Sequence, residues 1–475
     1  MPVVKKTINV TVIQIDPKQI MKPKNYKRNI PFVIPSKNSK VGVSELKQNK
    51  TPATFQRSLR VTLIIGQIFS LLPVKGVFNT NNAFFLCRFS WCSWKCTYLI
   101  LSLIGQFFIT FMCLYKVFHT TSSLNGTTPL IFYGTTGLTT IMFLRIAMRW
   151  PDLIRHIAHV EDLDPCYDRS LTFKCNATCG FVLFLALVEH LLSLLSAYTG
   201  AMICQSEDMT HESFVKHFYP WVFNFLPYSF GLGILTQFLH FQSTFIWNFS
   251  DLFVICISYY LTSRLNYVNK QLLNAQGKYL PEVFWRTVRE EYCRATQLVR
   301  RVDDVINGVI FISFANNLFF ICLQLFNSLE DGIKGNGECS SRGKGKTSTI
   351  LGGYEAASYF FFSLVYLIAR SVTVCLIASQ VNSASNVPAS VLYDVPSPVY
   401  CVEVQRFLDQ VNGDNIALSG LQFFSVTRGL LLTVAGTIVT YELVMFQFNS
   451  QPQSSNTSPT NPTLSFYNNT IIPIF

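Results

Sequence analysis

Apolar runs of about 20 residues recur along this chain, and they constrain its fold more than any other feature. A transmembrane helix needs about 20 consecutive, mainly apolar residues to cross the hydrocarbon core of a bilayer. Of the 475 residues, 49% are hydrophobic and only 13% are charged. A soluble domain carries about 25% charged residues. The sequence therefore predicts an all-α membrane protein with several spans.

Seven apolar stretches are candidates for these spans. We expect spanning helices S1 to S7 at residues 97–115, 129–148, 179–203, 240–262, 306–328, 350–380 and 429–448. A further run at 61–74 is too short to span and has basic residues on both sides, so we expect it to be re-entrant or to lie on the membrane. The long run 218–262 is interrupted near its start by Pro220 and Pro227. We expect the part of this run before residue 240 to be an outer segment that precedes S4.

The distribution of charge indicates an orientation. Lys and Arg greatly outnumber Asp and Glu within residues 1–57. Basic segments that flank spans usually stay in the cytoplasm, so we expect a cytoplasmic N-terminus and, after seven spans, an extracellular C-terminus. Beside a membrane domain, such a basic terminus indicates a cytoplasmic flank, and we expect no nucleic-acid partner.

Two kinds of modification are predicted on the extracellular side. The N-x-S/T pattern predicts glycosylation at Asn125, Asn456 and Asn468, which fall in predicted extracellular segments. Cys204 and Cys339 fall in extracellular loops, where either a disulfide or two free thiols would fit. The 14 cysteines include no C-x-x-C pair, so we expect no metal site and no cofactor.

Polar and ionisable side chains interrupt spans S3 to S6. Such groups are costly in a bilayer, face the bundle interior and mark functional sites by default. Given the predicted direction of each span, they lie at mid-depth or nearer the outside, which favours one pocket open to the outside. The candidate ligand-binding residues are Glu189, His190, Trp247, Asp251, Asn316, Gln324, Tyr354, Glu355 and Tyr359.

The chemistry of this pocket leaves two ligand classes open. Carboxylates and amides form paired hydrogen bonds with adjacent hydroxyls, and an aromatic face covers a pyranose ring, which suits a neutral sugar. The same groups would hold a cationic amine through charge and cation–π contacts. Alternatively, polar groups bond across helices and only hold the bundle together, which we favour for His190, Asn317 and Ser358 taken singly. Arg145 and Arg370 lie toward the cytoplasmic ends of their spans, where we expect both to snorkel.

The final span carries a polar stripe. Val444, Gln447, Phe448 and Gln451 recur at i, i+3, i+4 and i+7 and so share one helical face. A polar stripe that faces lipid is energetically costly, and rings of polar groups with apolar constrictions select and gate ions in pores. The pattern leaves open whether this face meets the bundle or a water-filled axis.

The same helix contains the motif TYELVMFQF at residues 440–448. It resembles the T-Y-h-h-h-h-h-Q-F signature of insect gustatory receptors, in which h is hydrophobic. The Glu after Thr-Tyr and the upstream TRGLLLTVAGTIV are similar to the sugar-receptor branch. Further likeness lies in LLPVKGV, VEHLLSLLS and FANNLFFICLQL, so the resemblance covers most of the chain from about residue 55.

This resemblance implies a fold and a pore. Such receptors look like tetrameric cation channels related to insect odorant receptors, in which the last helix is split into a cytoplasmic part and a pore helix. It implies a gate at Val444, Gln447 and Phe448 and a sugar site in the outer half of the bundle. The implied parts are a basic cytoplasmic segment (1–57), a re-entrant segment and loop (58–96), the ligand-binding bundle (97–380), a cytoplasmic anchor with a short helix (381–428), the pore helix (429–450) and a polar extracellular tail (451–475).

The expected function is a sugar-gated, non-selective cation channel in the plasma membrane of gustatory neurons. Its expected partners are a mono- or disaccharide, permeant cations, membrane lipid, and copies of itself or of related receptors in a tetramer. A subunit of a heteromeric taste channel, or a receptor for a non-sugar tastant, stays open. A G-protein-coupled receptor would have its N-terminus outside, a secondary transporter would show internal repeats, and an enzyme would need a catalytic constellation that His190 alone does not supply.

Overall fold

The computed structural model describes residues 54–77, 88–119, 124–166, 168, 170–204, 210–331 and 354–449. All of them belong to one compact unit, Thr51–Phe475. The described part of this unit is built almost entirely of α-helices, with two pairs of very short strands and one 3-10 turn at Ser397–Val399.

Six of the described helices are long and apolar enough to cross a membrane. They are α3 (Trp94–His119), α4 (Leu124–Leu163), α5 (Ser170–Cys204), α8 (Phe230–Ala275), α9 (Glu282–Asp331) and α10 (Glu355–Tyr393). They contain the predicted spans S1 to S5 and most of S6, which confirms the prediction of an all-α membrane protein. The last helix, α12 (Arg428–Asn449), coincides with S7 but is not among those six, so the count of seven spans stays a prediction.

Helix α8 lies at the centre of the helical bundle. It packs against α4, α5, α9 and α10, and nearly every residue from Gln242 to Leu265 is buried. A helix that is apolar all round is stable only when it is buried on all sides. The polar residues within this stretch must therefore find partners inside the protein.

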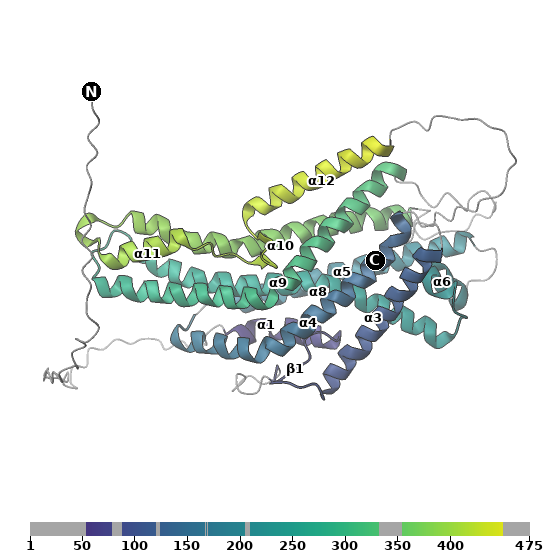
Figure 1. Ribbon diagram of the computed structural model, residues 1–475, viewed down its shortest axis with the longest axis horizontal. Coiled ribbons are helices and arrows are strands. Elements are labelled where there is room, and N and C mark those ends of the chain that lie inside the picture. The colour runs from purple at the N-terminus through teal and green to yellow at the C-terminus, as the bar shows by residue number, and fades with distance from the viewer. Residues whose placement is uncertain are drawn as a thin grey trace, which may run out of the picture. The chain divides into compact units, whose positions relative to one another are not determined.

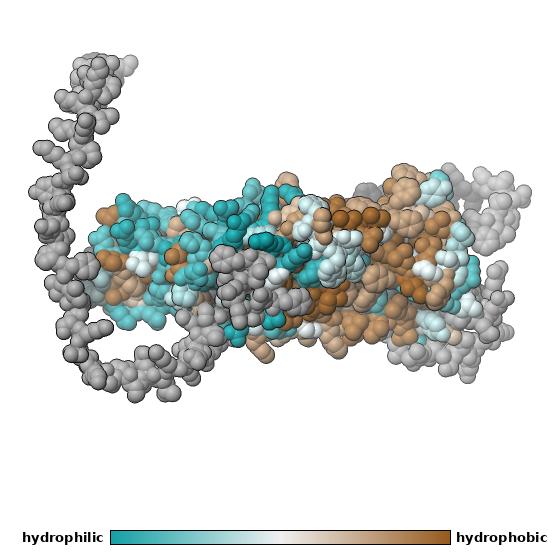
Figure 2. All heavy atoms as spheres, turned by 90° about the horizontal axis from the view of Figure 1, so that it is seen from below, coloured by the Kyte–Doolittle hydropathy of each residue, from teal (hydrophilic) through white to brown (hydrophobic). Residues whose placement is uncertain are grey.

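The two ends of this unit differ in surface chemistry. On the face drawn in Figure 2, hydrophobic side chains gather toward the end that holds α6, and hydrophilic ones toward the end that holds α11. Helices α8, α9 and α10 run side by side from one end to the other (Figure 1). Their 46, 50 and 39 residues exceed the length of a single span, so each continues well beyond the bilayer.

The short run at 61–74 forms a helix and a return. Helix α1 (Phe55–Ile68) packs against α5 and α8, and strand β1 (Val74–Lys75) pairs antiparallel with β2 (Arg88–Phe89). The side-chain amide of Gln67 donates to the backbone carbonyls of Leu72, at 3.1 Å, and Val74, at 2.8 Å. These two hydrogen bonds hold the return of the chain from α1 to β1. Whether this segment enters the bilayer stays a prediction.

A glycine at the α1–α8 contact yields a stability prediction. A Cβ at Gly66 would lie 2.6 Å from Cζ of Phe249, whose ring is fully buried. Because the core has no room to yield, we expect Gly66→Ala to cost about 1–3 kcal/mol through overpacking. The measurement is the temperature at which the detergent-purified protein loses its monodisperse elution peak.

Gly180→Ala on α5 provides the matched control. No atom lies within 4 Å of a Cβ at that position, and alanine favours a helix over glycine by about 1 kcal/mol. We therefore expect this variant to be at least as stable as the parent. Equal melting of both variants would contradict the close approach of α1 to α8.

Shorter helices complete the described unit. Helices α6 (His211–Phe218) and α7 (Pro220–Phe223) precede α8 at the place of the predicted outer segment. Helix α11 (Val402–Gly413) packs on α9 and α10, with the Glu403 carboxylate 2.8 Å from Nε of Arg289. The hydrogen bond from Arg289, with a second one from Arg406, holds the pKa of Glu403 below its ordinary value.

Candidate functional site

A buried ion pair lies in the centre of the bundle. Nε of Arg370 on α10 lies 2.9 Å from Oδ2 of Asp251 on α8, and both side chains are at most 2% exposed. The Asp251 carboxylate also accepts hydrogen bonds from the Ser313 hydroxyl and, at 3.1 Å, from the Asn317 amide on α9. One carboxylate thus joins three helices, and its charge is compensated inside the protein.

The guanidinium of Arg370 has further partners on α8 and α10. It donates to Oδ1 of Asn248, and its central carbon lies 4.5 Å from the centre of the Trp247 ring. The Tyr366 hydroxyl donates to the same Asn248 oxygen at 2.9 Å. We call this set of residues, with Asp251, Ser313 and Asn317, the ion-pair cluster. A delocalised, planar cation can pair with a carboxylate and lie over an aromatic ring at the same time.

The position of Arg370 corrects the expectation that it snorkels to the cytoplasmic surface. The residue is only 4% exposed, and its charge is paired with Asp251. The physical reason is that a charge within the bundle needs a counter-charge, and α8 supplies one at the same depth. Arg145, by contrast, is exposed.

A second cluster, the carboxylate–amide cluster, joins α5, α9 and α10. The Ser363 hydroxyl donates to Oε1 of Glu189 at 2.7 Å, and the Gln324 amide donates to Ser363 at 3.1 Å. All three side chains are buried, yet Oε1 of Gln324 has no hydrogen-bond partner among the described residues. Buried polar atoms are nearly always hydrogen-bonded, so this oxygen can accept a hydrogen bond from a further group.

Aromatic and imidazole rings gather around His190, the residue that follows Glu189. The ring of His190 lies 5.7 Å from that of His240 and 5.2 Å from that of Phe241, and the Tyr133 hydroxyl lies 2.9 Å from Nδ1 of His240. Three more buried polar atoms in this part of the chain lack a hydrogen-bond partner among the described residues: Nδ1 of His190, Oγ of Ser193 and Nε1 of Trp221. We call these residues the ring cluster.

A short hairpin attaches α12 to α9. Strands β3 (Ser419–Gly420) and β4 (Phe424–Ser425) pair antiparallel, and Leu421 and Gln422 between them adopt the left-handed conformation that is rare outside glycine. The Asp303 carboxylate of α9 accepts from the backbone N–H of Ser419, at 2.6 Å, and from its hydroxyl, at 2.7 Å. The hairpin ends three residues before α12 begins, so a shift of α9 can be passed to α12 through a short connection.

Helix α12 packs on α9 and α10 but leaves a large apolar surface uncovered. Leu432 is 76% exposed, and Val439 and Leu443 are each 59% exposed. Of the predicted gate residues, Val444 and Gln447 are exposed, while Phe448 is helical with its side chain outside the described part. The two carboxylate oxygens of Glu442 have no hydrogen-bond partner among the described residues.

Comparison with known proteins decides the family. Residues 25–336 and 346–457 match the model of the trehalose receptor family. The chain is 32% identical to the Drosophila melanogaster gustatory receptor for sugar taste 64f, over 89% of this chain and 87% of that protein. It is 31% identical to gustatory receptor 5a for trehalose of the same species, over 90% of this chain and 94% of that protein.

This chain belongs to the sugar branch of the insect gustatory receptors. The resemblance inferred from the motif at 440–448 is thereby confirmed. The receptor's fold is similar to that of the insect olfactory receptor OR5 from Machilis hrabei, solved alone and with eugenol, with TM-scores of 0.54 and 0.55 at 14% and 13% identity. The match with the eugenol complex covers 83% of this chain and 99% of that one. Its relatives are receptors, and the receptor is not an enzyme.

The receptor brings several of the predicted ligand residues together. Glu189, His190, Trp247, Asp251 and Gln324 belong to the three clusters described above. Asn316, Glu355 and Tyr359 are buried as well, and Tyr359 packs in the same apolar core as Trp247. Tyr354, just before α10, is 71% exposed and belongs to none of the clusters.

On one face of α10 in the receptor, only Tyr359 had been predicted as a site residue, whereas Ser363, Tyr366 and Arg370 had not. Tyr359, Ser363, Tyr366 and Arg370 are all buried and recur at i, i+4, i+7 and i+11. That spacing is a helical stripe and could have been found from the sequence. It was hidden because serine and tyrosine are common in apolar spans and because an arginine near a helix end usually snorkels.

The remaining predicted sites of the receptor are not tested. Asn125 lies in the first turn of α4, whereas Asn456 and Asn468 lie outside the described residues. Cys204 ends α5, and Cys339 is outside the described part, so their pairing stays a prediction. Within the described part of the chain, no group of three His, Cys, Asp or Glu side chains is placed to hold a metal.

Proposed function

We propose that this receptor is a sugar-gated cation channel, with the sugar bound among α5, α8, α9 and α10. The observation that carries the proposal is the set of buried, unpartnered polar atoms at His190, Ser193, Trp221 and Gln324, of which Gln324 is joined to the Glu189 carboxylate through Ser363. They include donors and acceptors, and a sugar hydroxyl can satisfy either kind. The rings of the ring cluster offer apolar faces to the C–H surface of a pyranose.

The charge balance supports a neutral ligand over a cationic amine. Asp251, which would be the natural counter-ion of an amine, is already paired with Arg370. Glu189 already accepts a hydrogen bond from the Ser363 hydroxyl. A carboxylate bound in this way suits hydrogen bonds with the hydroxyls of a neutral ligand better than it suits an ion pair with an amine. The names of the relatives, sugar taste and trehalose, agree with a mono- or disaccharide.

The proposed pore is lined by α12 from four copies of the chain or of related receptors. Its support is the uncovered apolar surface of α12, which a single chain leaves exposed, together with Val444 and Gln447 on one helical face. In this arrangement Gln447 and Phe448 line the gate, with Val444 one turn below. The receptor would act in the plasma membrane of gustatory neurons, with its N-terminus in the cytoplasm.

Whole-cell current in cells that express this chain, challenged with mono- and disaccharides, tests the proposal. We expect Glu189→Gln to raise the half-effective sugar concentration at least about tenfold, because a charged acceptor contributes about 1.5–3 kcal/mol. Glu212→Gln is the matched control, since Glu212 is exposed and pairs only with Lys216 in the described structure. Gln447→Ala should change the current without changing sugar binding to the purified receptor.

Two outcomes would change the proposal. Sugar binding without current would indicate that a related subunit must complete the pore. Unaltered sugar responses in Glu189→Gln would remove the carboxylate–amide cluster from the binding site.

A further inference from the structure

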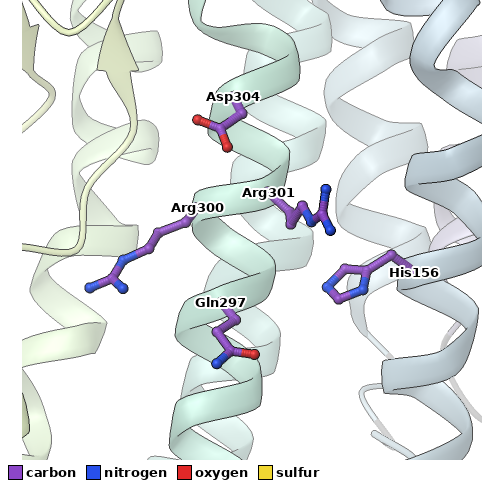
Figure 3. A pocket seen from close by; sticks show the side chains of 5 residues that line it. All are labelled: His156, Gln297, Arg300, Arg301 and Asp304. Atoms are coloured by element: carbon purple, nitrogen blue, oxygen red, sulfur yellow. The ribbon is translucent and has the colours of Figure 1, made fainter.

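A basic hollow lies between α4 and α9, on the parts of both helices that extend beyond their predicted spans. It measures about 290 Å³ and is lined by His156, Gln297, Arg300, Arg301 and Asp304. Figure 3 shows that the side chains of Arg301 and His156 point toward each other across the gap between the two helices, while Arg300 points the other way. Gln297, Arg301 and Asp304 are spaced i, i+4 and i+7 and so line one face of α9.

One of the two guanidinium groups that line this hollow has no ion-pair partner in the described structure. Arg301 has no ion-pair partner among the described residues, whereas Arg300 is paired with Asp414 at 2.7 Å. A buried nitrogen of His156, Nε2, has no hydrogen-bond partner there either. Arg149 donates to the backbone carbonyl of Asp304 at 3.4 Å and so places a further guanidinium at one end. The Arg301 guanidinium thus faces an imidazole rather than a carboxylate, and an anion between the two would be attracted to its charge.

We propose that this hollow binds a phosphate monoester, carried by a phosphoinositide headgroup or by a soluble inositol phosphate. A phosphate accepts two parallel hydrogen bonds from a guanidinium, and the Arg301 side chain presents this fork. The His156 nitrogen and the Gln297 amide supply further donors on either side. Asp304 is the one carboxylate that lines the hollow, and it lies at the end where Arg149 approaches.

The distance of the hollow from the hydrocarbon core of the membrane suits a lipid headgroup. The predicted spans end at residue 148 on α4 and begin at residue 306 on α9. At 1.5 Å per helical residue, His156 and Arg301 then lie roughly 10 Å from the cytoplasmic face of the hydrocarbon core. Basic pockets between transmembrane helices on the cytoplasmic side bind phosphoinositide headgroups.

The same turn of α9 that lines the hollow also holds the attachment of α12. Arg300, whose side chain points away from that of Arg301, binds Asp414, and Asp303 binds Ser419 of the hairpin. A phosphate group that pulls Arg301 toward α4 therefore acts on the segment that carries α12. This consequence for current rests on the proposed channel function, whereas phosphate binding itself does not.

Fluorescence polarisation with the full-length, detergent-purified receptor tests the binding. The probe is a fluorescent, short-chain phosphatidylinositol bisphosphate, and the unlabelled competitors are the same lipid without its label, inositol trisphosphate and short-chain phosphatidylserine. We expect Arg301→Gln and His156→Gln each to raise the Kd at least about tenfold. Arg155→Gln is the matched control, because Arg155 is exposed and pairs with Asp152 on its own helix. It should leave the Kd unchanged.

The competitors distinguish the two sources of phosphate. If inositol trisphosphate displaces the probe at the same concentration as the unlabelled phosphoinositide, the ligand is a soluble inositol phosphate. If only the unlabelled phosphoinositide displaces the probe, the ligand is a membrane lipid. Equal displacement by phosphatidylserine would overturn the proposal, because the hollow would then hold any anionic lipid. So would a Kd that is the same in Arg301→Gln and in the parent. None of these results depends on sugar, so they are independent of the test of the channel.

Discussion

Asp251→Leu alone will lose most of the folded receptor, and the double variant Asp251→Leu/Arg370→Met will recover much of it. Removing one partner of a buried ion pair leaves an uncompensated charge and costs about 3–5 kcal/mol. That is a large part of the 5–15 kcal/mol by which a folded protein is typically stable. Both side chains are at most 2% exposed, so water cannot replace the missing partner.

Recovery in the double variant should be incomplete. Ser313 and Asn317 donate to Asp251, and Asn248 accepts from Arg370, so these groups would keep a polar atom without its partner. The measurement is the yield and thermal stability of the monodisperse elution peak of the detergent-solubilised receptor. Single variants as stable as the parent would contradict a formed ion pair.

The same double variant separates stability from response. If it folds and binds sugar but gives no current, the ion-pair cluster takes part in coupling the site to the pore. If it folds and responds normally, the cluster only holds α8, α9 and α10 together.

Asp303→Ala will reduce the maximal sugar-evoked current at least about tenfold while sugar binding is kept. Its carboxylate holds Ser419 through two hydrogen bonds, one from the backbone and one from the hydroxyl, at 2.6 and 2.7 Å. A hydrogen bond to a charged group contributes about 1.5–3 kcal/mol, and 1.4 kcal/mol is a tenfold change in an equilibrium. The substitution weakens the connection between α9 and α12. Gln324 of the proposed sugar site lies far from Asp303 along α9, so sugar binding should be unaffected.

Asp162→Ala is the control for this prediction, because Asp162 is exposed on α4. Current is compared with surface expression and with binding of labelled sugar to the purified receptor. Loss of current and of sugar binding together would indicate a folding defect, and Asp303→Asn, which keeps one acceptor oxygen, would then be the variant to measure. Unchanged current would show that the hairpin does not carry the signal.

The sequence by itself determined the helices and the family. Six long apolar runs can satisfy their backbone groups in a bilayer only as helices, so their positions follow from composition and length. The residues of TYELVMFQF identified the branch because that motif combines polar and apolar types that chance rarely places together. Glu189, Trp247, Asp251 and Gln324 stood out because polar groups within a span need a partner.

Only the tertiary structure decided which of these groups meet. Arg370 pairs with Asp251 because α10 crosses α8 at that depth, and no spacing within one helix encodes a crossing. The hairpin at 419–425 has strands of two residues each, too short for a periodic signal, and Leu421 and Gln422 hold left-handed conformations that their side chains do not favour. Their positions follow from the contact with Asp303 and Asn307 of α9, residues more than a hundred positions away in the chain.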